Sequence, residues 1–170
     1  MEFEKVNELI NQRKFKEAKA ILIDLIQKNK RLNNKLEYNE KNFKNIYFIL
    51  SQICSQLNEL KDSIKYLEEH IKINPNDCEG LLSLANLQLK IRQTENTEKN
   101  YKKILNINKN YTPALINLAF FYEGIGKISD AKKCYERAYK LHPENLNYFY
   151  NIIRIDPSYI NDERINYMNI

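Results

Sequence analysis

Apolar and small residues recur along this chain with a period of 34 positions. The columns that keep this step through three successive repeats are Tyr47, Leu81 and Leu115; Leu50, Leu84 and Leu118; Ser51, Ala85 and Ala119; Ser63, Thr97 and Ala131; and Leu67, Tyr101 and Tyr135. In the third repeat, Leu115, Leu118 and Tyr122 lie at i, i+3 and i+7, which is one face of an α-helix. The pattern therefore predicts that each repeat is an antiparallel helix pair, a helix A followed by a helix B.

Turn and stop residues indicate where these helices end. Gly126 separates helix A from helix B in the third repeat and tolerates a positive φ, and Asn58 holds the matching place in the first repeat. The second repeat has Arg92 and Gln93 there. Pro143 ends the third helix B because it has no N–H to donate. These signals predict helix pairs over about 2–30, 40–74, 78–108 and 112–142, then helices over about 145–155 and 157–168.

Both ends of the chain depart from the regular step. Residues 14–18 echo residues 127–131, yet Ala18 and Ser63 are 45 positions apart, which is 34 plus 11. Eleven residues make about three helical turns. We therefore expect a long helix B over about 15–30, a polar connection near 31–38 and a long helix A over about 40–57.

At the other end, Pro157 follows Asp156 and predicts the start of a last helix over about 157–168. Its expected role is to cover the exposed face of the final repeat, as the ends of repeat arrays require. An exposed docking strip for another chain is the alternative.

The columns and their 34-residue step resemble the tetratricopeptide repeat (TPR) family. The resemblance covers residues 44–145 well and residues 2–30 and 146–156 weakly. It implies an all-α fold, a right-handed superhelical solenoid over residues 1–170 as a single domain, with about three clear repeats, a divergent first helix pair and capping helices at the C-terminal end. It also implies that the helices A line a concave groove, which binds a peptide or a helix of a partner protein.

In the family, the side chains that face this groove lie on helix A, away from the packing columns. The matching positions here are Asn45, Phe48 and Gln52 in the first repeat, Ser83, Asn86 and Lys90 in the second, Asn117 and Phe120 in the third, and Tyr150, Asn151 and Arg154 in a fourth helix A. This candidate groove is rich in amides and aromatic rings and carries little charge. Such a surface favours apolar and backbone contacts over the capture of charge.

One well-known TPR class binds the C-terminal carboxylate of chaperone tails with a clamp of Lys, Asn and Arg side chains. The matching positions here are Phe48, Gln52, Ser83, Pro113 and Asn117, and none of them is cationic. A tail carboxylate would therefore lack a countercharge. We expect that this protein is not of the type that clamps Hsp70 or Hsp90.

Other TPR solenoids bind peptide backbone with a ladder of Asn side chains. Asn117 and Asn151 are 34 positions apart in that column, whereas Ile49 and Ser83 interrupt it. An Asn amide can donate to a peptide carbonyl and accept from a peptide N–H. Because Asn is common throughout this chain, a ladder and a purely compositional origin both stay open.

The sequence has no recognisable catalytic or cofactor-binding motif. GxxxxGK[ST], GxGxxG, HExxH and GxSxG do not occur. His70 is interpreted as a core or half-core residue and His142 as a helix-end residue. Cys54, Cys78 and Cys134 are far apart, without CxxC spacing, which predicts free thiols in a reducing compartment. We expect no enzyme activity, no cofactor and no metal.

Charge and hydropathy limit the remaining choices. The chain has 27 basic and 22 acidic residues, and its net charge of +5 is unevenly spread, with +4 in residues 1–44 and +3 in residues 78–111. No run of about 18 apolar residues could form a membrane span, and the charged N-terminal segment lacks a signal-peptide core. These features predict a cytoplasmic protein.

The leading hypothesis is a non-enzymatic scaffold or adaptor, which binds a partner protein in the groove or packs as a subunit of a larger complex. The alternative from another class is RNA or other nucleic acid, bound through the basic N-terminal segment and through Lys99, Lys102 and Lys103. It is the weaker alternative because no long basic block occurs. Self-association through the last helix is a third hypothesis.

Overall fold

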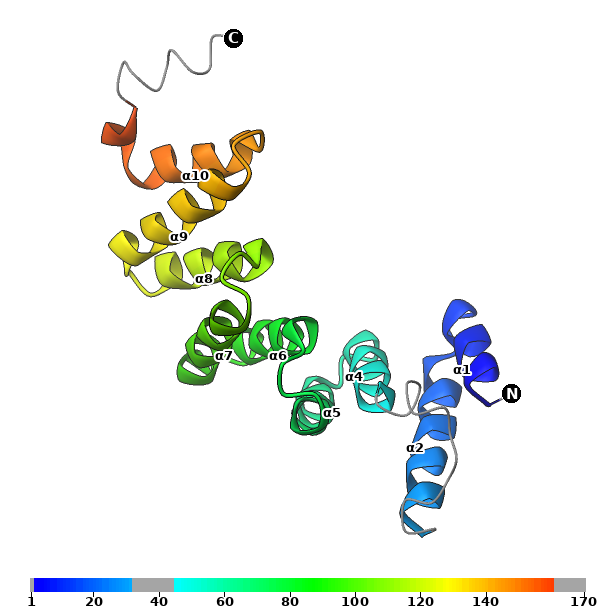
Figure 1. The fold of residues 1–170 in the computed structure, drawn as a ribbon. Coiled ribbons are helices and arrows are strands. Elements are labelled where there is room, and N and C mark those ends of the chain that lie inside the picture. Colours follow the sequence, from blue (N-terminus) through cyan, green and yellow to red (C-terminus); the bar gives the residue numbers. More distant parts are fainter. Residues whose placement is uncertain (1, 32–44, 161–170) are drawn as a thin grey trace. The chain divides into compact units, whose positions relative to one another are not determined.

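The computed structural model describes residues 2–31 and 45–160, and every described element is helical (Figure 1). The α-helices are α1 (Glu2–Asn11), α2 (Phe15–Arg31), α4 (Ile46–Gln56), α5 (Leu60–Ile73), α6 (Cys78–Lys90), α7 (Thr94–Ile107), α8 (Thr112–Gly124), α9 (Ile128–Leu141) and α10 (Leu146–Ile155). A 3-10 turn, η1 (Pro157–Tyr159), follows α10. The all-α prediction is confirmed for the described residues.

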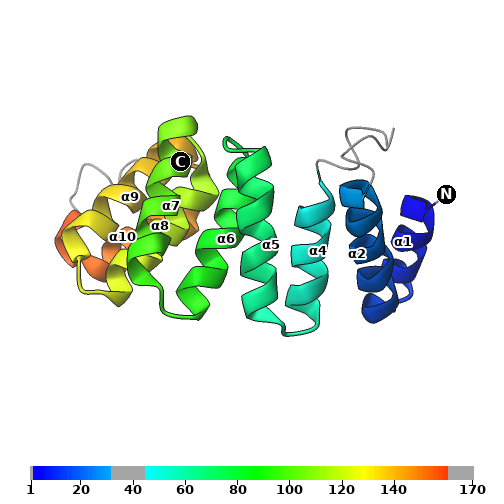
Figure 2. The same cartoon turned by 90° about the horizontal axis from the view of Figure 1, so that it is seen from below.

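The chain divides into two compact units, which we call the N-terminal unit (1–93) and the C-terminal unit (94–170). The division falls between α6 and α7, inside the second predicted repeat. Within the N-terminal unit, α4 packs against α5 and α5 against α6, as Figure 2 also shows. Within the C-terminal unit, α8 packs against α9 and α9 against α10. The single domain over residues 1–170 stays a prediction.

Four helix-to-helix turns share one local structure. Each has a residue with positive φ: Arg13 (57°), Asn58 (60°), Arg92 (61°) and Gly126 (76°). The next residue donates its N–H to the carbonyl five positions back: Lys14 to Leu9 (2.8 Å), Glu59 to Cys54 (2.8 Å), Gln93 to Gln88 (2.9 Å) and Lys127 to Tyr122 (2.8 Å). These bonds close a Schellman motif, which satisfies carbonyls that the helix end leaves free. The positive φ predicted at Asn58 and Gly126 is confirmed.

Small side chains let helices A and B pack closely in each unit. Ala119 on α8 and Ala131 and Ala138 on α9 are fully buried. In the N-terminal unit, Ser51 and Ser63 hold two of the same columns, and the Ser63 hydroxyl donates to the Ser51 carbonyl at 2.7 Å. A buried hydroxyl needs such a partner. A serine can therefore occupy this small-residue column, because its hydroxyl bonds from α5 to α4.

The end of the chain differs from its prediction. From Pro157 the chain makes a single 3-10 turn, and Ile160 has an extended backbone (φ −77°, ψ 101°), so the predicted helix over 157–168 is wrong at its start. Asp156 accepts bonds from both the Ser158 N–H and the Lys132 ammonium, and the Tyr159 ring lies 6.2 Å from that of Phe149. These contacts to α9 and α10 favour a local turn. Residues 161–168 lie outside the described part.

At the N-terminal end, part of the prediction also lies outside the described residues. The connection near 31–38 and the start of the long helix A over 40–57 fall largely within 32–44. In the described part, α4 begins at Ile46, with Asn45 as its N-cap residue. Lys19 on α2 forms ion pairs with Glu59 (2.5 Å) and Asp62 (3.5 Å), which tie α2 to the start of α5.

Candidate peptide-binding faces

The predicted groove residues divide between the two units. Asn45, Phe48, Gln52, Ser83, Asn86 and Lys90 belong to α4 and α6 of the N-terminal unit. Asn117, Phe120, Tyr150, Asn151 and Arg154 belong to α8 and α10 of the C-terminal unit.

In the N-terminal unit, four of the six predicted residues surround one hollow of about 210 Å³. Gln52 on α4 and Ser83, Asn86 and Lys90 on α6 line it. Four serines (Ser51, Ser55, Ser63 and Ser83) belong to the same lining, together with the apolar residues Leu67 and Leu87. The hollow is therefore small and of mixed polarity, with Lys90 as the charged residue of its described lining. Its size suits a small group of a ligand more than a large apolar side chain.

The other two predicted residues of this unit do not line the hollow. Asn45 is exposed at the start of α4. Phe48 is only half-buried, yet its ring lies against the imidazole of His70, with 5.3 Å between the ring centres. Phe48 is thus at least partly a packing residue.

His70 is part of a junction between α5 and α6. It is 1% exposed, and its Nε2 lies 2.7 Å from Oδ2 of Asp77, the N-cap residue of α6. The predicted core position of His70 is confirmed. The sequence did not reveal its partner Asp77, nor Gly80, where an added Cβ would lie 2.9 Å from Cδ2 of His70. The sequence signal that could have revealed this junction is a histidine followed by an N-cap Asp and then by a Gly inside the next helix.

In the C-terminal unit, two large aromatic rings are exposed on helices A. Phe120 on α8 is 50% exposed, and Tyr150 on α10 is 59% exposed. The Phe120 ring also meets the edge of the buried Tyr135 ring, at 5.7 Å between centres. Asn117 and Asn151 are half-buried on the same two helices. Exposed aromatic rings beside amides are typical of surfaces that bind other proteins.

The charge of Arg154 is compensated within this face. Its guanidinium donates to the carboxylate of Glu123 on α8 at 2.8 Å, and the Tyr135 hydroxyl donates to the same carboxylate at 2.5 Å. Burial and the bond to Glu123 raise the pKa of Tyr135, so its hydroxyl stays a donor. The pKa of Arg154 is raised by its bond to Glu123. The predicted cation of the groove is therefore half of an ion pair, which joins α8 to α10.

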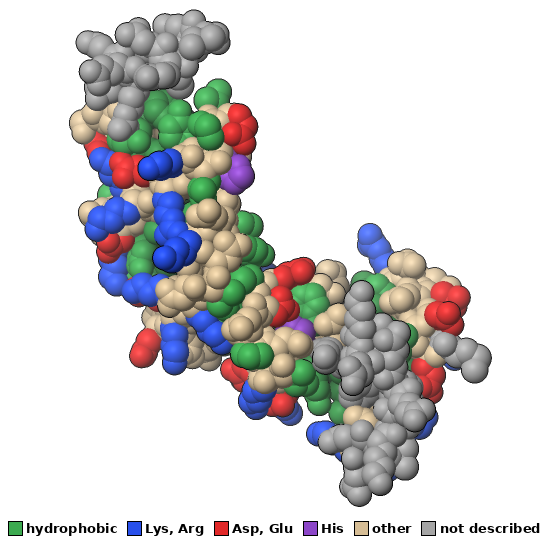
Figure 3. All heavy atoms as spheres, in the orientation of Figure 1, with side chains coloured by type: hydrophobic (Ala, Val, Ile, Leu, Met, Phe, Trp, Pro, Cys, Tyr) green, Lys and Arg blue, Asp and Glu red, His purple; other side chains and the backbone are tan. Residues whose placement is uncertain are grey.

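The lysines proposed for nucleic-acid binding are also partly compensated. Lys102 on α7 forms an ion pair with Glu98 at 2.7 Å, and Glu98 lies 3.5 Å from Lys127. The bond from Lys102 is the main cause of the lowered pKa of Glu98. On the face drawn in Figure 3, Lys and Arg side chains are interspersed with Asp and Glu. This arrangement does not favour the nucleic-acid alternative.

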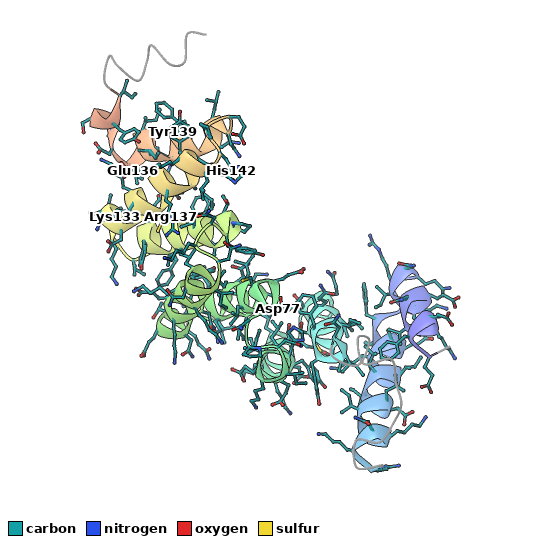
Figure 4. The ribbon with its side chains drawn as sticks, viewed as in Figure 1. Asp77, Lys133, Glu136, Arg137, Tyr139 and His142 are labelled. Carbon is teal, nitrogen blue, oxygen red and sulfur yellow. The ribbon has the colours of Figure 1, made fainter. Side chains whose placement is uncertain are left out.

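His142 lies where the end of α9 contacts the start of α8. Figure 4 shows it at the C-terminal end of α9, on which Lys133, Glu136, Arg137 and Tyr139 also lie. Its Nε2 lies 3.0 Å from Oγ1 of Thr112, the first residue of α8. The contact joins the end of helix B to the start of helix A within the third repeat.

Two further observations concern the part of the chain that the structure describes. No group of three or more His, Cys, Asp and Glu side chains there could hold a metal ion. None of its helices combines the length and apolar character needed to cross a bilayer.

Comparison with known protein families finds matches at the first and third predicted repeats. The tetratricopeptide repeat profile matches residues 45–77 and 112–145. A search of curated proteins finds no match to the sequence.

Solved structures with a similar fold are TPR proteins of low sequence identity. The crystal structure of MamA has a TM-score of 0.75 at 14% identity, over 96% of this chain and 90% of that one. YrrB, described as a TPR protein with an unusual peptide-binding site, has a TM-score of 0.67 at 15% identity, over 88% of this chain and 72% of that one. The first TPR of Spaghetti (RPAP3), solved with the HSP90 peptide SRMEEVD, has a TM-score of 0.61 at 16% identity, over 68% of this chain and 91% of that one.

Proposed function

Since the chain is a tetratricopeptide repeat protein, we propose that it is a non-enzymatic scaffold or adaptor, which binds a peptide segment of a partner protein on the helix-A face of α8 and α10. The observation that carries the proposal is the exposure of Phe120 and Tyr150 on this face. Aromatic side chains that lose water on binding are frequent energetic centres of protein interfaces.

The surroundings of the two rings agree with a peptide ligand. Asn117 and Asn151 can donate to and accept from a peptide backbone, which gives affinity with little dependence on the ligand's sequence. The ion pair between Glu123 and Arg154 leaves little uncompensated charge on the face. The ligand is therefore recognised mainly by apolar side chains and by its backbone. Packing as a subunit of a larger complex would use the same face.

The test starts from a displayed library of random peptides, selected on the full chain. Binding constants of the selected peptides are then measured for the wild type, Phe120→Ala, Tyr150→Ala and the double variant Asn117→Ala with Asn151→Ala. Either aromatic substitution should weaken binding by about tenfold or more. Ile128→Ala is the matched control, because Ile128 is 44% exposed on helix B of the same repeat. Equal binding by the two aromatic variants and the control would refute this face. Unchanged affinity of the double Asn variant would remove the ladder.

The proposal excludes capture of a chaperone tail through its terminal carboxylate. Gln52, Ser83 and Asn117 stand at clamp positions and carry no charge. The peptide SRMEEVD, which Spaghetti binds in its solved structure, should show no saturable binding to this chain in a calorimetric titration. Saturable binding that is lost when the peptide's C-terminus is amidated would contradict the exclusion.

A cytoplasmic location belongs to the same proposal. Its support is the state of the three cysteines, all of which are free, since thiols persist in reducing compartments. Fractionation of the cells that make the protein would test it.

A further inference from the structure

A second hollow, of about 660 Å³, lies in the N-terminal unit beside the α1–α2 turn. One side is formed by the end of α1 and the start of α2, with Ile10, Arg13 and Phe15. The other side is formed by the C-terminal half of α4, with Gln52, Ile53 and Gln56. Its size falls within the range of about 300–1,000 Å³ that ligand sites usually have.

The hollow occurs where the repeat spacing is stretched. The left-handed residues Asn58, Arg92 and Gly126 follow one another at steps of 34, whereas Arg13 precedes Asn58 by 45. The pair α1–α2 is therefore out of step with the regular repeats that follow it. The hollow beside this turn is a feature of the irregular junction.

The lining combines apolar walls with a single cation. Ile53 is buried, and Ile10 and Phe15 are half-buried and pack into the core of the unit. The helix α4 has no acidic residue in its first turn and no basic residue in its last, and its sequence IYFILSQICSQ is uncharged throughout. Arg13 is thus the one charged residue of the described lining. It is exposed, and it forms no ion pair with the described residues.

These properties define the chemistry of a ligand. An aliphatic side chain fits against Ile10 and Ile53, where water is easily displaced. A carboxylate next to it meets the Arg13 guanidinium, which can donate two parallel hydrogen bonds to it. The amides of Gln52 and Gln56 can bond the ligand's backbone.

We propose that this junction hollow is a second binding site, which takes an internal peptide segment in which an aliphatic residue is followed by an acidic one. The inference rests on the proposed function in that the ligand is a peptide. All of its residues lie in the N-terminal unit, whereas the face of α8 and α10 lies in the C-terminal unit. The two sites can therefore fail separately.

The experiment follows backbone amide signals of the full 15N-labelled chain during titration with a short probe. The probe is acetyl-Gly-Leu-Asp-Gly-amide, whose ends are blocked. Two matched probes replace Asp by Asn or Leu by Ser. We expect shifts at Ile10, Arg13, Phe15 and Ile53, and binding that is weaker by about fivefold or more for either matched probe.

Arg13→Gln should remove the preference for Asp over Asn. Arg92→Gln is the matched control, because Arg92 is also an exposed arginine with positive φ in a helix-to-helix turn, and it should keep the preference. Arg13→Gly is a second variant, whose backbone adopts positive φ without strain. It should also lose the preference, and its unchanged amide spectrum away from the hollow would show that the fold is intact.

Two results would overturn the proposal. They are an absence of shifts around the hollow and equal affinity of the wild type for the Asp and Asn probes. If library peptides bind the C-terminal unit while the probe leaves the hollow unshifted, the proposed function stands and this site is refuted. If the probe binds here while Phe120→Ala and Tyr150→Ala bind library peptides like the wild type, this site stands and the proposed face of α8 and α10 is refuted.

Discussion

At the residue scale, the turns between paired helices show how much strain this chain tolerates. Of the four residues with positive φ in these turns, only Gly126 is a glycine, and two are arginines. A side chain in this conformation costs about 1–2 kcal/mol because its Cβ approaches the following carbonyl. The hydrogen bonds of the turn, and the packing of the two helices it joins, offset that cost. Arg13 and Arg92 are thus places where the turn imposes a conformation that the residue does not favour.

Arg92→Gly should therefore stabilise the protein. Relief of the left-handed strain outweighs the extra freedom that glycine gives the unfolded chain, for a net gain of about 0.5–1 kcal/mol in the free energy of unfolding. Urea denaturation measures it. Gly126→Ala is the converse variant and should lose about 1 kcal/mol, although no atom lies within 4 Å of the added Cβ. A neutral Gly126→Ala would show that these turns are not strained.

Two glycine-to-alanine substitutions test whether the junction around His70 is crowded, one at Gly80 in the junction and one at Gly124 on α8 as the control. In Gly80→Ala the new methyl group would lie 2.9 Å from His70 Cδ2 and 3.0 Å from Asp77 Oδ2, so overpacking should cost about 1–3 kcal/mol. In Gly124→Ala nothing lies within 4 Å of the new Cβ. Because Gly124 is helical, this change should be neutral or stabilising by up to about 1 kcal/mol. Thermal melts that shift in the same direction for both variants would contradict the proposed crowding.

At the element scale, the small residues decide how closely helices A and B pack. Ala119 and Ala131 are fully buried on α8 and α9. Ser51 and Ser63 occupy these two columns in the N-terminal unit, where their extra oxygens are satisfied by hydrogen bonds. The columns therefore limit side-chain volume more than polarity. Repeats with Ser, Thr or Ala there can keep the same packing.

Ala119→Leu and Ala131→Phe should each overpack this contact. The expected loss is about 1–3 kcal/mol in the free energy of unfolding, measured by chemical denaturation. Ser129→Leu is a control on the same helix pair, since Ser129 is exposed at the start of α9, and it should change stability by less than about 0.5 kcal/mol. Unchanged stability in both core variants would refute the packing.

The turn η1 should respond to acid. The bond from Lys132 is the main cause of the lowered pKa of Asp156, and Ser158 adds to it. A carboxyl whose pKa is lower in the folded state stabilises the fold above its unfolded pKa of about 3.9, and this contribution is lost as the pH falls through the folded value. Between about pH 5 and pH 2, wild type should lose more stability than Asp156→Asn. Parallel pH dependences would show that the ion pair does not stabilise the fold.

At the scale of the whole molecule, the 34-residue columns were sufficient to predict the helical repeats, because each helix is specified by its own apolar face. The candidate faces were less predictable, because contacts between helices decide them. The spacing placed Arg154 in the groove, but only the packing of α8 and α10 shows that Glu123 compensates its charge. The ring of Phe48 against His70 is another such contact. The division between α6 and α7 also depends on packing.

The repeated hydrogen-bonded turn has a consequence for how such a chain can change its length. Each turn completes its bonds within about six residues, so its structure does not depend on which helix pair follows. A duplication or deletion that joins two of these turns in phase would recreate the same turn at the new join. Recombination in steps of 34 codons could therefore lengthen or shorten the coding sequence without creating a new kind of local structure, and only the side chains between newly adjacent repeats would need to adapt.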